Sequence, residues 1–411
     1  MASVKASVMQ RITRNPRLLR LIFGVLRRFR PILKIRNAVL ILRHEDVVEV
    51  LERDDDFTLA EVMAPRMACG RFLLGMDRSP QYEAERGLLA KVCPSDDLER
   101  VAQLAGRFCD RQLDAARAQG RLDLVRDIAE YVPRNIVADY FGVPGPNQHD
   151  MAIWQRKLAS LIVDPNPDTS GLKAEAARYA DKLNSYLDGL IEERLHELRG
   201  PGKPADNVLN RLLRLHLAPS CGIGLDVVKR NIAGLCVTGT APVTKAMTLL
   251  VYQLLTMPEA REGVRAAARA EDVEAVKHFA FEALRFNPLF PIQPRICPHD
   301  TVIRANKTGA TPVRGGSRIM LATLSAMFDG DAYYLPDRFK PGRAVSGYLH
   351  FGHGMHECFG RRIAEAQIPV TVMKLMQLPN LRRASRGKAR IRYDGPAVIG
   401  LPLEFDRESS A

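Results

Sequence analysis

The sequence has few of the features that mark secreted, disulfide-rich or repeat proteins. Its seven cysteines are odd in number and include no C-x-x-C pair, and only 6% of its residues are aromatic. Such a set of cysteines is typical of reduced thiols in a cytoplasm. The chain also contains no internal repeat and no low-complexity tract, which argues against solenoids and arrays.

The N-terminal segment, residues 1–36, has no hydrophobic run long enough to cross a membrane. Its longest uncharged stretch, Leu21 to Leu26, is bounded by arginines, and no small-residue cleavage site follows an apolar core. We therefore predict neither a transmembrane anchor nor a signal peptide. The segment is basic and amphipathic, so two interpretations stay open. We favour a helix that packs its Leu and Ile face on the protein body over a peripheral contact with an anionic membrane surface.

Length and composition are those of a soluble globular protein. The 411 residues are 46% hydrophobic and 26% charged, and we expect a single domain, 1–411, located in the cytoplasm. The formal net charge of +13 indicates an anionic partner such as an acidic protein, a membrane surface or nucleic acid. Of these three we do not expect nucleic acid.

Helical periodicity dominates the chain. Apolar residues recur at helical spacing over 47–57, 97–120, 175–200, 227–259 and 270–286. Short β-branched stretches at 38–43 and 300–313 predict a small sheet with hairpins, and loops are expected at 163–171 and 199–207. The sequence thus predicts a mainly α fold with a small β portion.

The stretch HFGHGMHECFG, residues 350–360, holds three histidines and Cys358. A structural zinc site would need a second, separated pair of ligands, which the chain lacks, so zinc is the weaker interpretation. The glycines indicate a backbone that turns sharply and lets a flat group approach. Helical periodicity resumes after Cys358, which places its thiol at a helix N-terminus, where amide dipoles favour a thiolate. A thiolate in such a loop can coordinate haem iron.

This loop resembles the haem-ligand motif of the cytochrome P450 family, F-G-x-G-x-H-x-C-x-G. The motif is filled by Phe351, Gly352, Gly354, His356, Cys358 and Gly360. Glu282 and Arg285 in FEALRFNP are similar to the family's E-x-x-R pair, and Arg338 in YLPDRFKPGR is similar to the arginine that joins them. The resemblance spans nearly the whole chain and implies the cytochrome P450 fold, with haem between a long central helix and the helix after Cys358.

The resemblance also implies which side chains hold the cofactor, expected to be heme b. Cys358 would be its iron ligand. The positions that match the family's propionate-binding residues are Tyr82, Arg86, Arg295 and His356. Arginine suits this role because its fork pairs with a carboxylate through two hydrogen bonds. His350 and His353 keep the ordinary interpretation of loop-packing or exposed histidines.

One pair of residues departs from the family's pattern. The central helix normally carries an acid and a threonine that deliver protons, whereas here Ala241 and Pro242 stand at those positions and cannot carry a proton. Pro242 also removes a helical amide and predicts a local kink. Thr238, a freed carbonyl or ordered water would have to replace the relay, and on helical-wheel grounds Thr240 and Thr244 are expected to point elsewhere.

The implied activity is that of a monooxygenase that inserts one oxygen atom of O2 into an apolar organic substrate. No flavin or nicotinamide domain fits in the chain, so electrons would come from a separate partner, expected to be an acidic ferredoxin. Candidate docking side chains are Arg361, Arg362 and Lys374. The substrate pocket is expected to include Met67, Phe72, Leu235, Leu289, Phe290 and Ile292.

Two other functions stay open at this point. Family members that use peroxide or rearrange a hydroperoxide dispense with the acid and the alcohol, as this chain does, but Ala241 stands where such peroxygenases commonly have an arginine. A non-enzymatic haem carrier or sensor would keep the cofactor residues and show no turnover. The monooxygenase is the interpretation that we prefer.

Overall fold

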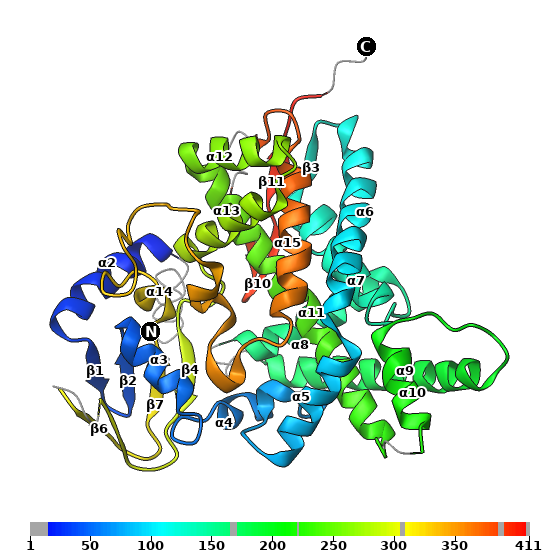
Figure 1. Cartoon of the computed structure of the whole chain (residues 1–411), viewed down its shortest axis with the longest axis horizontal. Coiled ribbons are helices and arrows are strands. Elements are labelled where there is room, and N and C mark those ends of the chain that lie inside the picture. Colours follow the sequence, from blue (N-terminus) through cyan, green and yellow to red (C-terminus); the bar gives the residue numbers. More distant parts are fainter. Residues whose placement is uncertain (1–14, 165–170, 220–221, 305–308, 385–389, 408–411) are drawn as a thin grey trace.

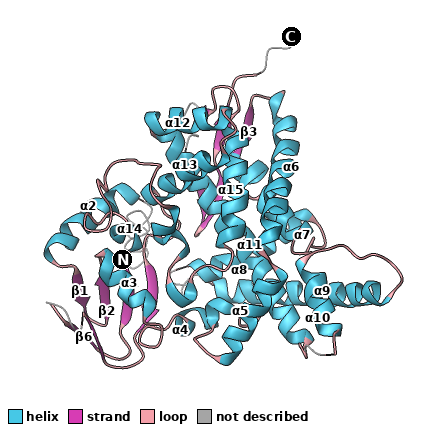
Figure 2. Ribbon diagram, viewed as in Figure 1, coloured by secondary structure: helices cyan, strands magenta, loops and turns pink. Residues whose placement is uncertain are grey.

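The computed structural model describes residues 15–164, 171–219, 222–304, 309–384 and 390–407. Helices make up most of this part of the chain, and short strands lie in separate small sheets (Figure 2). The prediction of a mainly α fold with a small β portion is confirmed.

The helices coincide with the periodic segments of the sequence. In chain order they are α2 (Pro16–Phe29), α3 (His44–Glu52), α4 (Ala60–Met63), α5 (Pro80–Val92), α6 (Leu98–Arg117), α7 (Tyr131–Asp139), α8 (Gln148–Val163), α9 (Leu172–Arg199), α10 (Val208–Leu217), α11 (Leu225–Thr256), α12 (Pro258–Arg269), α13 (Val273–Phe286), α14 (Thr323–Ala326) and α15 (Arg361–Met376). A π-helical turn, Leu124–Ala129, precedes α7. The segment 227–259 is divided because Pro258 begins a new helix, as proline favours the first helical turn.

The largest sheet has four strands. In spatial order they are β1 (Ile32–Ile35), β2 (Ala38–Ile41), β7 (Arg318–Leu321) and β4 (Gln293–Ile296), with β2 and β7 parallel and the other neighbours antiparallel. In the three-stranded sheet β11 (Pro402–Glu404) lies between β3 (Arg121–Asp123) and β8 (Arg382–Arg383). The two-stranded sheets pair β9 (Arg392–Asp394) with β10 (Ala397–Gly400), and β5 (Thr301–Ile303) with β6 (Thr311–Val313). The strands expected at 38–43 and 300–313 are β2 and the β5–β6 pair. The expected loop at 199–207 is irregular, and most of 163–171 lies outside the described residues.

Helix α11 forms the centre of the molecule (Figure 1). It packs against α7, α8, α9, α10, α12, α13 and α15. Among the described residues it is the one helix long and apolar enough to cross a membrane, but 61% of its apolar window is buried inside the protein. A helix surrounded in this way is the core of the fold rather than a membrane span. Helix α15 also packs on α6 and α13.

Helix α2 docks on the body by only part of its surface. It begins at Pro16, where the Asn15 side chain accepts a hydrogen bond from the Leu18 N–H, and it buries Leu19 and Phe23. The other large apolar side chains of its Leu and Ile face remain half-buried or exposed. The expectation that this whole face packs on the body is therefore wrong for most of the helix. Residues 1–14 lie outside the described part of the chain.

Candidate active site

Cys358 ends a tight glycine turn three residues before Arg361, the first residue of α15. Gly352 and Gly354 have φ angles of +75° and +70°, in the left-handed region where side chains with a Cβ are strained. The Cys358 N–H donates to the Phe351 carbonyl at 2.8 Å and closes the loop. The loop geometry therefore fixes where the thiol points.

The Cys358 side chain is accessible at its surface, yet burial raises the pKa of its thiol. A hydrogen bond from the Gly360 N–H and the positive charge of Arg86 act in the opposite direction and lower that pKa. Cys358 is thus an accessible sulfur, with one set of surroundings that favours the thiol and another that favours the thiolate. Such an electropositive helix start is where a thiolate forms.

The three histidines of the loop point to three different partners. His350 Nε2 lies 2.9 Å from the Phe281 carbonyl, and His353 Nε2 lies 2.9 Å from Glu52 Oε1. His356 Nε2 is buried without a hydrogen-bond partner. Over the described ranges, no group of three or more His, Cys, Asp or Glu residues could hold a metal ion. The zinc interpretation therefore finds no site in this loop.

Two side chains of α5, Tyr82 and Arg86, contact the cysteine loop. Tyr82 is buried and its hydroxyl donates to the Met355 carbonyl at 2.5 Å. Arg86, one turn later on α5, donates to Tyr82 Oη at 3.2 Å and to the Glu357 carbonyl at 3.4 Å. Helix α5 therefore holds the loop through carbonyl groups.

Burial disfavours the charged forms of Arg295 on β4 and of His356. Arg295 is only 4% exposed, and the hydrogen bond that its guanidinium donates goes to the neighbouring Pro294 carbonyl at 2.8 Å. Burial lowers its pKa to about 10. Burial, and next the charge of Arg295, lower the pKa of His356 to about 4.

The basic side chains near Cys358, which are the cations Arg86 and Arg295 and the neutral imidazole of His356, lack acidic partners. In the described part of the chain no carboxylate forms an ion pair with Arg86, Arg295 or His356. A buried cation without a counter-charge is costly, so this cluster suits an anionic ligand. An accessible sulfur beside basic side chains is the donor set that a haem with two propionates requires, and the residues present fit that cofactor.

Behind the loop, Glu282 and Arg285 form a fully buried ion pair on α13. Arg285 Nε and Nη2 donate to the two Glu282 carboxylate oxygens at 2.9 and 2.7 Å. The Tyr348 hydroxyl and the Lys340 N–H also donate to Glu282, at 2.6 and 2.8 Å. Arg285 Nη1 reaches the Pro336 carbonyl at 2.7 Å. The pair thus holds the segment that leads into the cysteine loop.

The third arginine of this cluster is not the one expected. Arg338 is exposed, and it contributes its backbone carbonyl, which accepts from Arg285 Nη2 at 3.1 Å. The guanidinium near Glu282 belongs to Arg343, whose Nε lies 3.5 Å from Oε1. The expectation for Arg338 is wrong because the chain turns its carbonyl towards Arg285 there, which directs the side chain outward. Arg343 is the last residue of the same segment, YLPDRFKPGR, five residues after Arg338.

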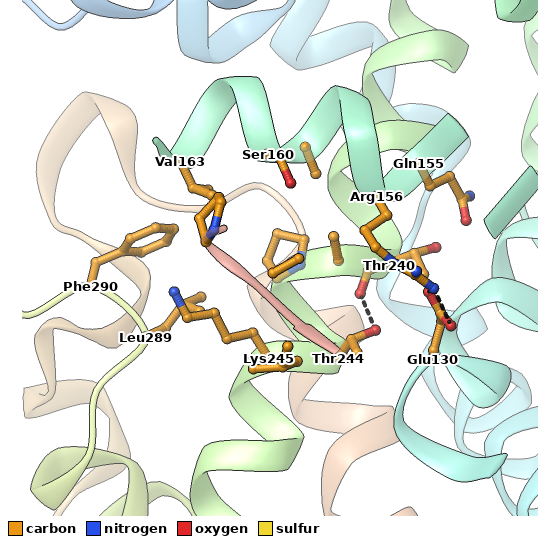
Figure 3. A pocket seen from close by; sticks show the side chains of 16 residues that line it. Glu130, Gln155, Arg156, Ser160, Val163, Thr240, Thr244, Lys245, Leu289 and Phe290 are labelled. Atoms are coloured by element: carbon orange, nitrogen blue, oxygen red, sulfur yellow. Dashed lines mark hydrogen bonds and ion pairs between the residues drawn. The ribbon is translucent and has the colours of Figure 1, made fainter. Parts of the chain in front are cut away.

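A cavity lies beside Ala241 and Pro242 on α11 (Figure 3). It encloses about 520 Å³ of space, part of it open to solvent. Apolar side chains including Val163, Leu289 and Phe290 gather at one end of the view, and polar side chains gather at the other. The polar end is formed by Glu130, Gln155, Arg156, Thr240 and Thr244.

Several polar atoms of this cavity are positioned but not satisfied. Thr240 Oγ1 and Gln155 Oε1 are buried without a hydrogen-bond partner. Arg156 Nη2 donates to the two Glu130 carboxylate oxygens, Oε1 at 2.8 Å and Oε2 at 3.1 Å. Thr244 Oγ1 donates to the Thr240 carbonyl at 2.9 Å. Thr240 and Thr244 lie at the polar end of the cavity with Glu130 and Arg156 (Figure 3). The expectation that they point away from the relay position stays a prediction.

Thr238 is already engaged within its own helix. Its hydroxyl donates to the Gly234 carbonyl at 2.7 Å, and it lines a second cavity together with Met67 and Phe72. Helix α11 continues unbroken through Pro242. Thr238 therefore has its proton committed to Gly234 rather than directed towards Ala241.

The expected pocket residues are divided between these cavities. Leu289 and Phe290 line the first, and Met67 and Phe72 line the second. Leu235 lines neither, because it is buried in the core. Ile292 also lines neither and packs against the core just before β4. No local sequence pattern indicates Glu130, Gln155 or Arg156, because only the packing of α8 and of the start of α7 against α11 brings them to the cavity.

The fold and this site together define a haem-thiolate oxygenase, and comparison with known proteins agrees. Residues 27–402 match the family model described as Cytochrome P450. Mycinamicin IV hydroxylase/epoxidase of Micromonospora griseorubida is 26% identical over 93% of this chain and 94% of its own. Erythromycin C-12 hydroxylase of Saccharopolyspora erythraea is 28% identical over 92% of this chain and 91% of its own.

Solved structures show the same fold. The crystal structure of CalO2 superposes with a TM-score of 0.80 at 21% identity and covers 95% of this chain and 97% of its own. Epothilone D-bound cytochrome P450epoK gives a TM-score of 0.78 at 22% identity and covers 96% of this chain and 97% of its own. The chain belongs to the cytochrome P450 family and is a bacterial-type haem-thiolate monooxygenase.

Proposed function

We propose that this monooxygenase uses heme b, with Cys358 as the iron ligand, to hydroxylate or epoxidise an apolar substrate. The observation that carries the proposal is the buried, unpaired cation Arg295, together with the unpartnered imidazole of His356, beside an accessible cysteine sulfur. For hydroxylation the reaction joins substrate R–H, O2, two electrons and two protons, and it yields R–OH and water. When bound, haem supplies the oxygen-activating redox chemistry.

The side chains of the chain itself divide the remaining tasks. Arg86 and Arg295 would pair with the propionates by charge, and His356 would offer them its free ring nitrogen. Tyr82 holds the Met355 carbonyl so that the loop keeps its shape. Leu289 and Phe290 offer apolar surface that positions the substrate and excludes water. Relatives named as vitamin D(3) 25-hydroxylase and steroid C26-monooxygenase support a bulky apolar substrate.

We place the source of protons at Glu130 rather than on α11. Ala241 and Pro242 have no titratable atom, and the Thr238 hydroxyl proton is committed to Gly234. Glu130 and the free Thr240 Oγ1 line the same cavity as Ala241. Glu130 is ion-paired with Arg156, so it would first take up a proton from solvent and then pass it through ordered water to Thr240 Oγ1. Arg156 would stabilise the carboxylate before and after the transfer.

The monooxygenase takes its electrons from a separate redox partner, and we propose an acidic ferredoxin. Of the three candidate docking side chains, Arg361 pairs with Glu357 and Glu365, and Lys374 pairs with Asp110. Arg362 is exposed and forms no ion pair within the described ranges. It is therefore the cation of this group best placed for an acidic partner. We further propose a cytoplasmic location and a peripheral contact of the N-terminal segment with a membrane surface.

Product formation with two oxidants tests the proposed reaction and its proton source. With O2 and a reduced ferredoxin we expect product from apolar substrates, and hydrogen peroxide alone should give much less. Glu130→Gln should lower the yield of product per electron consumed by about tenfold, which corresponds to roughly 1.4 kcal/mol in the protonation step. The matched control is Glu262→Gln, which removes an exposed carboxylate on α12.

Two outcomes would contradict these proposals separately. Product from peroxide, or from hydroperoxides, without any reductant would favour the peroxide-using alternative. An unchanged yield per electron in Glu130→Gln would remove Glu130 from the proton route while leaving the reaction itself intact.

Arg295→Leu tests the cofactor role without measuring turnover. In haem-free protein we expect this variant to raise the free energy of unfolding by about 1 kcal/mol or more, since it removes a buried charge without a partner. In a haem titration the same variant should bind at least about tenfold more weakly. Arg304→Leu is the control, because Arg304 is buried but paired with Asp46, and its loss should destabilise both forms. A lower free energy of unfolding of haem-free Arg295→Leu would mean that Arg295 stabilises the fold rather than binding the cofactor.

A further inference from the structure

The excess of basic over acidic residues in this protein comes almost entirely from one end of its sequence. Residues 1–43 contain 11 of the 60 Lys and Arg residues and none of the 47 Asp and Glu residues. The other 368 residues therefore carry 49 basic against 47 acidic side chains and are almost neutral. The net charge of +13 is thus a property of the N-terminal segment rather than of the catalytic body.

Helix α2 is tied firmly to the body on one side. Leu19 and Phe23 are buried. Arg27 donates to the Ser325 and Phe328 carbonyls at 2.8 and 2.7 Å, and Arg20 pairs with Asp337 at 3.2 Å. These contacts hold the helix in one orientation, so its outward face is a fixed surface.

The outward face of α2 is apolar. Ten large apolar side chains of the described residues are exposed, and six of them lie between positions 18 and 35. On α2 they are Leu18, Leu21, Ile22, Val25 and Phe29, with Leu21, Val25 and Phe29 between 61% and 71% exposed. Successive residues of a helix are rotated by about 100°, so the five occupy one stripe about 100° wide. We call this stripe the α2 outer face.

Basic side chains border the α2 outer face. On the helical wheel Arg17 and Arg28 fall along one edge of the stripe, and both are exposed. Neither forms an ion pair with any residue that the structure describes. Arg30, at the C-cap, is exposed as well. Long basic side chains at the edge of an apolar stripe can reach phosphate groups while the stripe enters an apolar layer.

The hairpin of β1 and β2 also exposes basic and apolar groups. Lys34 and Ile35 at the end of β1 and Arg36 in the turn are exposed, and Arg36 has a φ of +51°, which belongs to a tight turn. Helix α2, β1 and β2 lie at the same end of the molecule, at the left of Figure 1. Exposed apolar and basic groups therefore recur at this end of the protein.

We infer that the α2 outer face inserts into the surface of an anionic lipid bilayer, which gives the proposed membrane contact a defined face and lipid class. A segment without a single acidic residue complements phospholipid headgroups of negative charge. A second copy of the chain would instead bring two such basic segments together, and their charges would repel. The inference does not depend on the haem chemistry, because the face and the cysteine loop belong to different elements.

Vesicle sedimentation with the full-length holoenzyme tests this inference. We expect binding to phosphatidylglycerol vesicles that is at least about tenfold tighter than binding to phosphatidylcholine vesicles and that weakens at high salt. The variant Leu21→Gln/Val25→Gln/Phe29→Gln should lose this binding. The control Leu225→Gln/Ile399→Gln also replaces exposed apolar side chains, but away from α2, and should bind normally. Arg17→Gln/Arg28→Gln should bind several-fold more weakly.

A fluorescent reporter distinguishes insertion from mere adsorption. In a Trp154→Phe background, which removes the single tryptophan, Phe29→Trp should shift its emission to shorter wavelength with phosphatidylglycerol vesicles. Equal binding to both lipids, binding that survives the triple variant, or no shift would overturn the inference. So would a dimer in sedimentation velocity that the triple variant abolishes, because a second copy would then cover the face. Ferredoxin-driven product formation in solution should be unchanged in the triple variant, so failure of this inference is separable from failure of the proposed reaction.

Discussion

Replacement of Arg285 by leucine is expected to lower the free energy of unfolding by about 3–5 kcal/mol. The reason is that Glu282, fully buried, would keep its negative charge and lose both hydrogen bonds from the guanidinium. The carbonyls of Met327 and Pro336 would lose the hydrogen bond from Arg285 as well, whereas that of Arg338 would keep Arg343 Nη2 as a donor. Urea denaturation measures the change, and the yield of soluble haem-loaded protein should fall with it.

Two controls separate the buried charge from other effects. The double variant Glu282→Leu/Arg285→Leu removes both charges and should recover part of the loss, since an apolar pair can replace a buried ion pair. Arg361→Leu removes an arginine from a more exposed pair and should cost about 1 kcal/mol or less. A single variant as stable as the parent would show that Tyr348, Lys340 and Arg343 together satisfy Glu282 without Arg285.

Cys358→Ala is expected to abolish ferredoxin-driven product formation and thiolate ligation together. The thiol is accessible, so its removal should change the free energy of unfolding of the haem-free chain little. The absorption spectrum of the CO-bound ferrous protein reports the ligand directly. We expect the absorption band of this form to move away from the position that is typical of thiolate ligation. Cys297→Ala is the control, because Cys297 is a free cysteine buried near β4. A Cys358→Ala protein with the parent spectrum would contradict the assignment.

The local parts of the site could be predicted from the sequence. The glycine turn, the cysteine and the helix after it are neighbours in the chain, and turn chemistry and periodicity act over a few residues. The buried pair of Glu282 and Arg285 follows the same logic, because residues three apart share a helix face. These elements lie where the sequence placed them.

The other parts depend on packing that no local pattern contains. Arg343 rather than Arg338 reaches Glu282, because the direction of an irregular segment is set by the carbonyls that Arg285 binds. Glu130 and Gln155 come to the cavity beside Ala241 only through the way α7 and α8 pack on α11. Hydrophobic spacing identified α2 as amphipathic, but it could not tell which part of a wide apolar face the body would cover.

The hold of α5 on the cysteine loop has a consequence for how this protein tolerates mutation. Tyr82 and Arg86 bind the carbonyls of Met355 and Glu357, and a carbonyl is common to every amino acid. Substitutions at positions 355 and 357 therefore leave the acceptors in place, whereas a change at Tyr82 or Arg86 removes a donor. Residues 355 and 357 can therefore be substituted in evolution while the backbone geometry around the Cys358 sulfur stays the same.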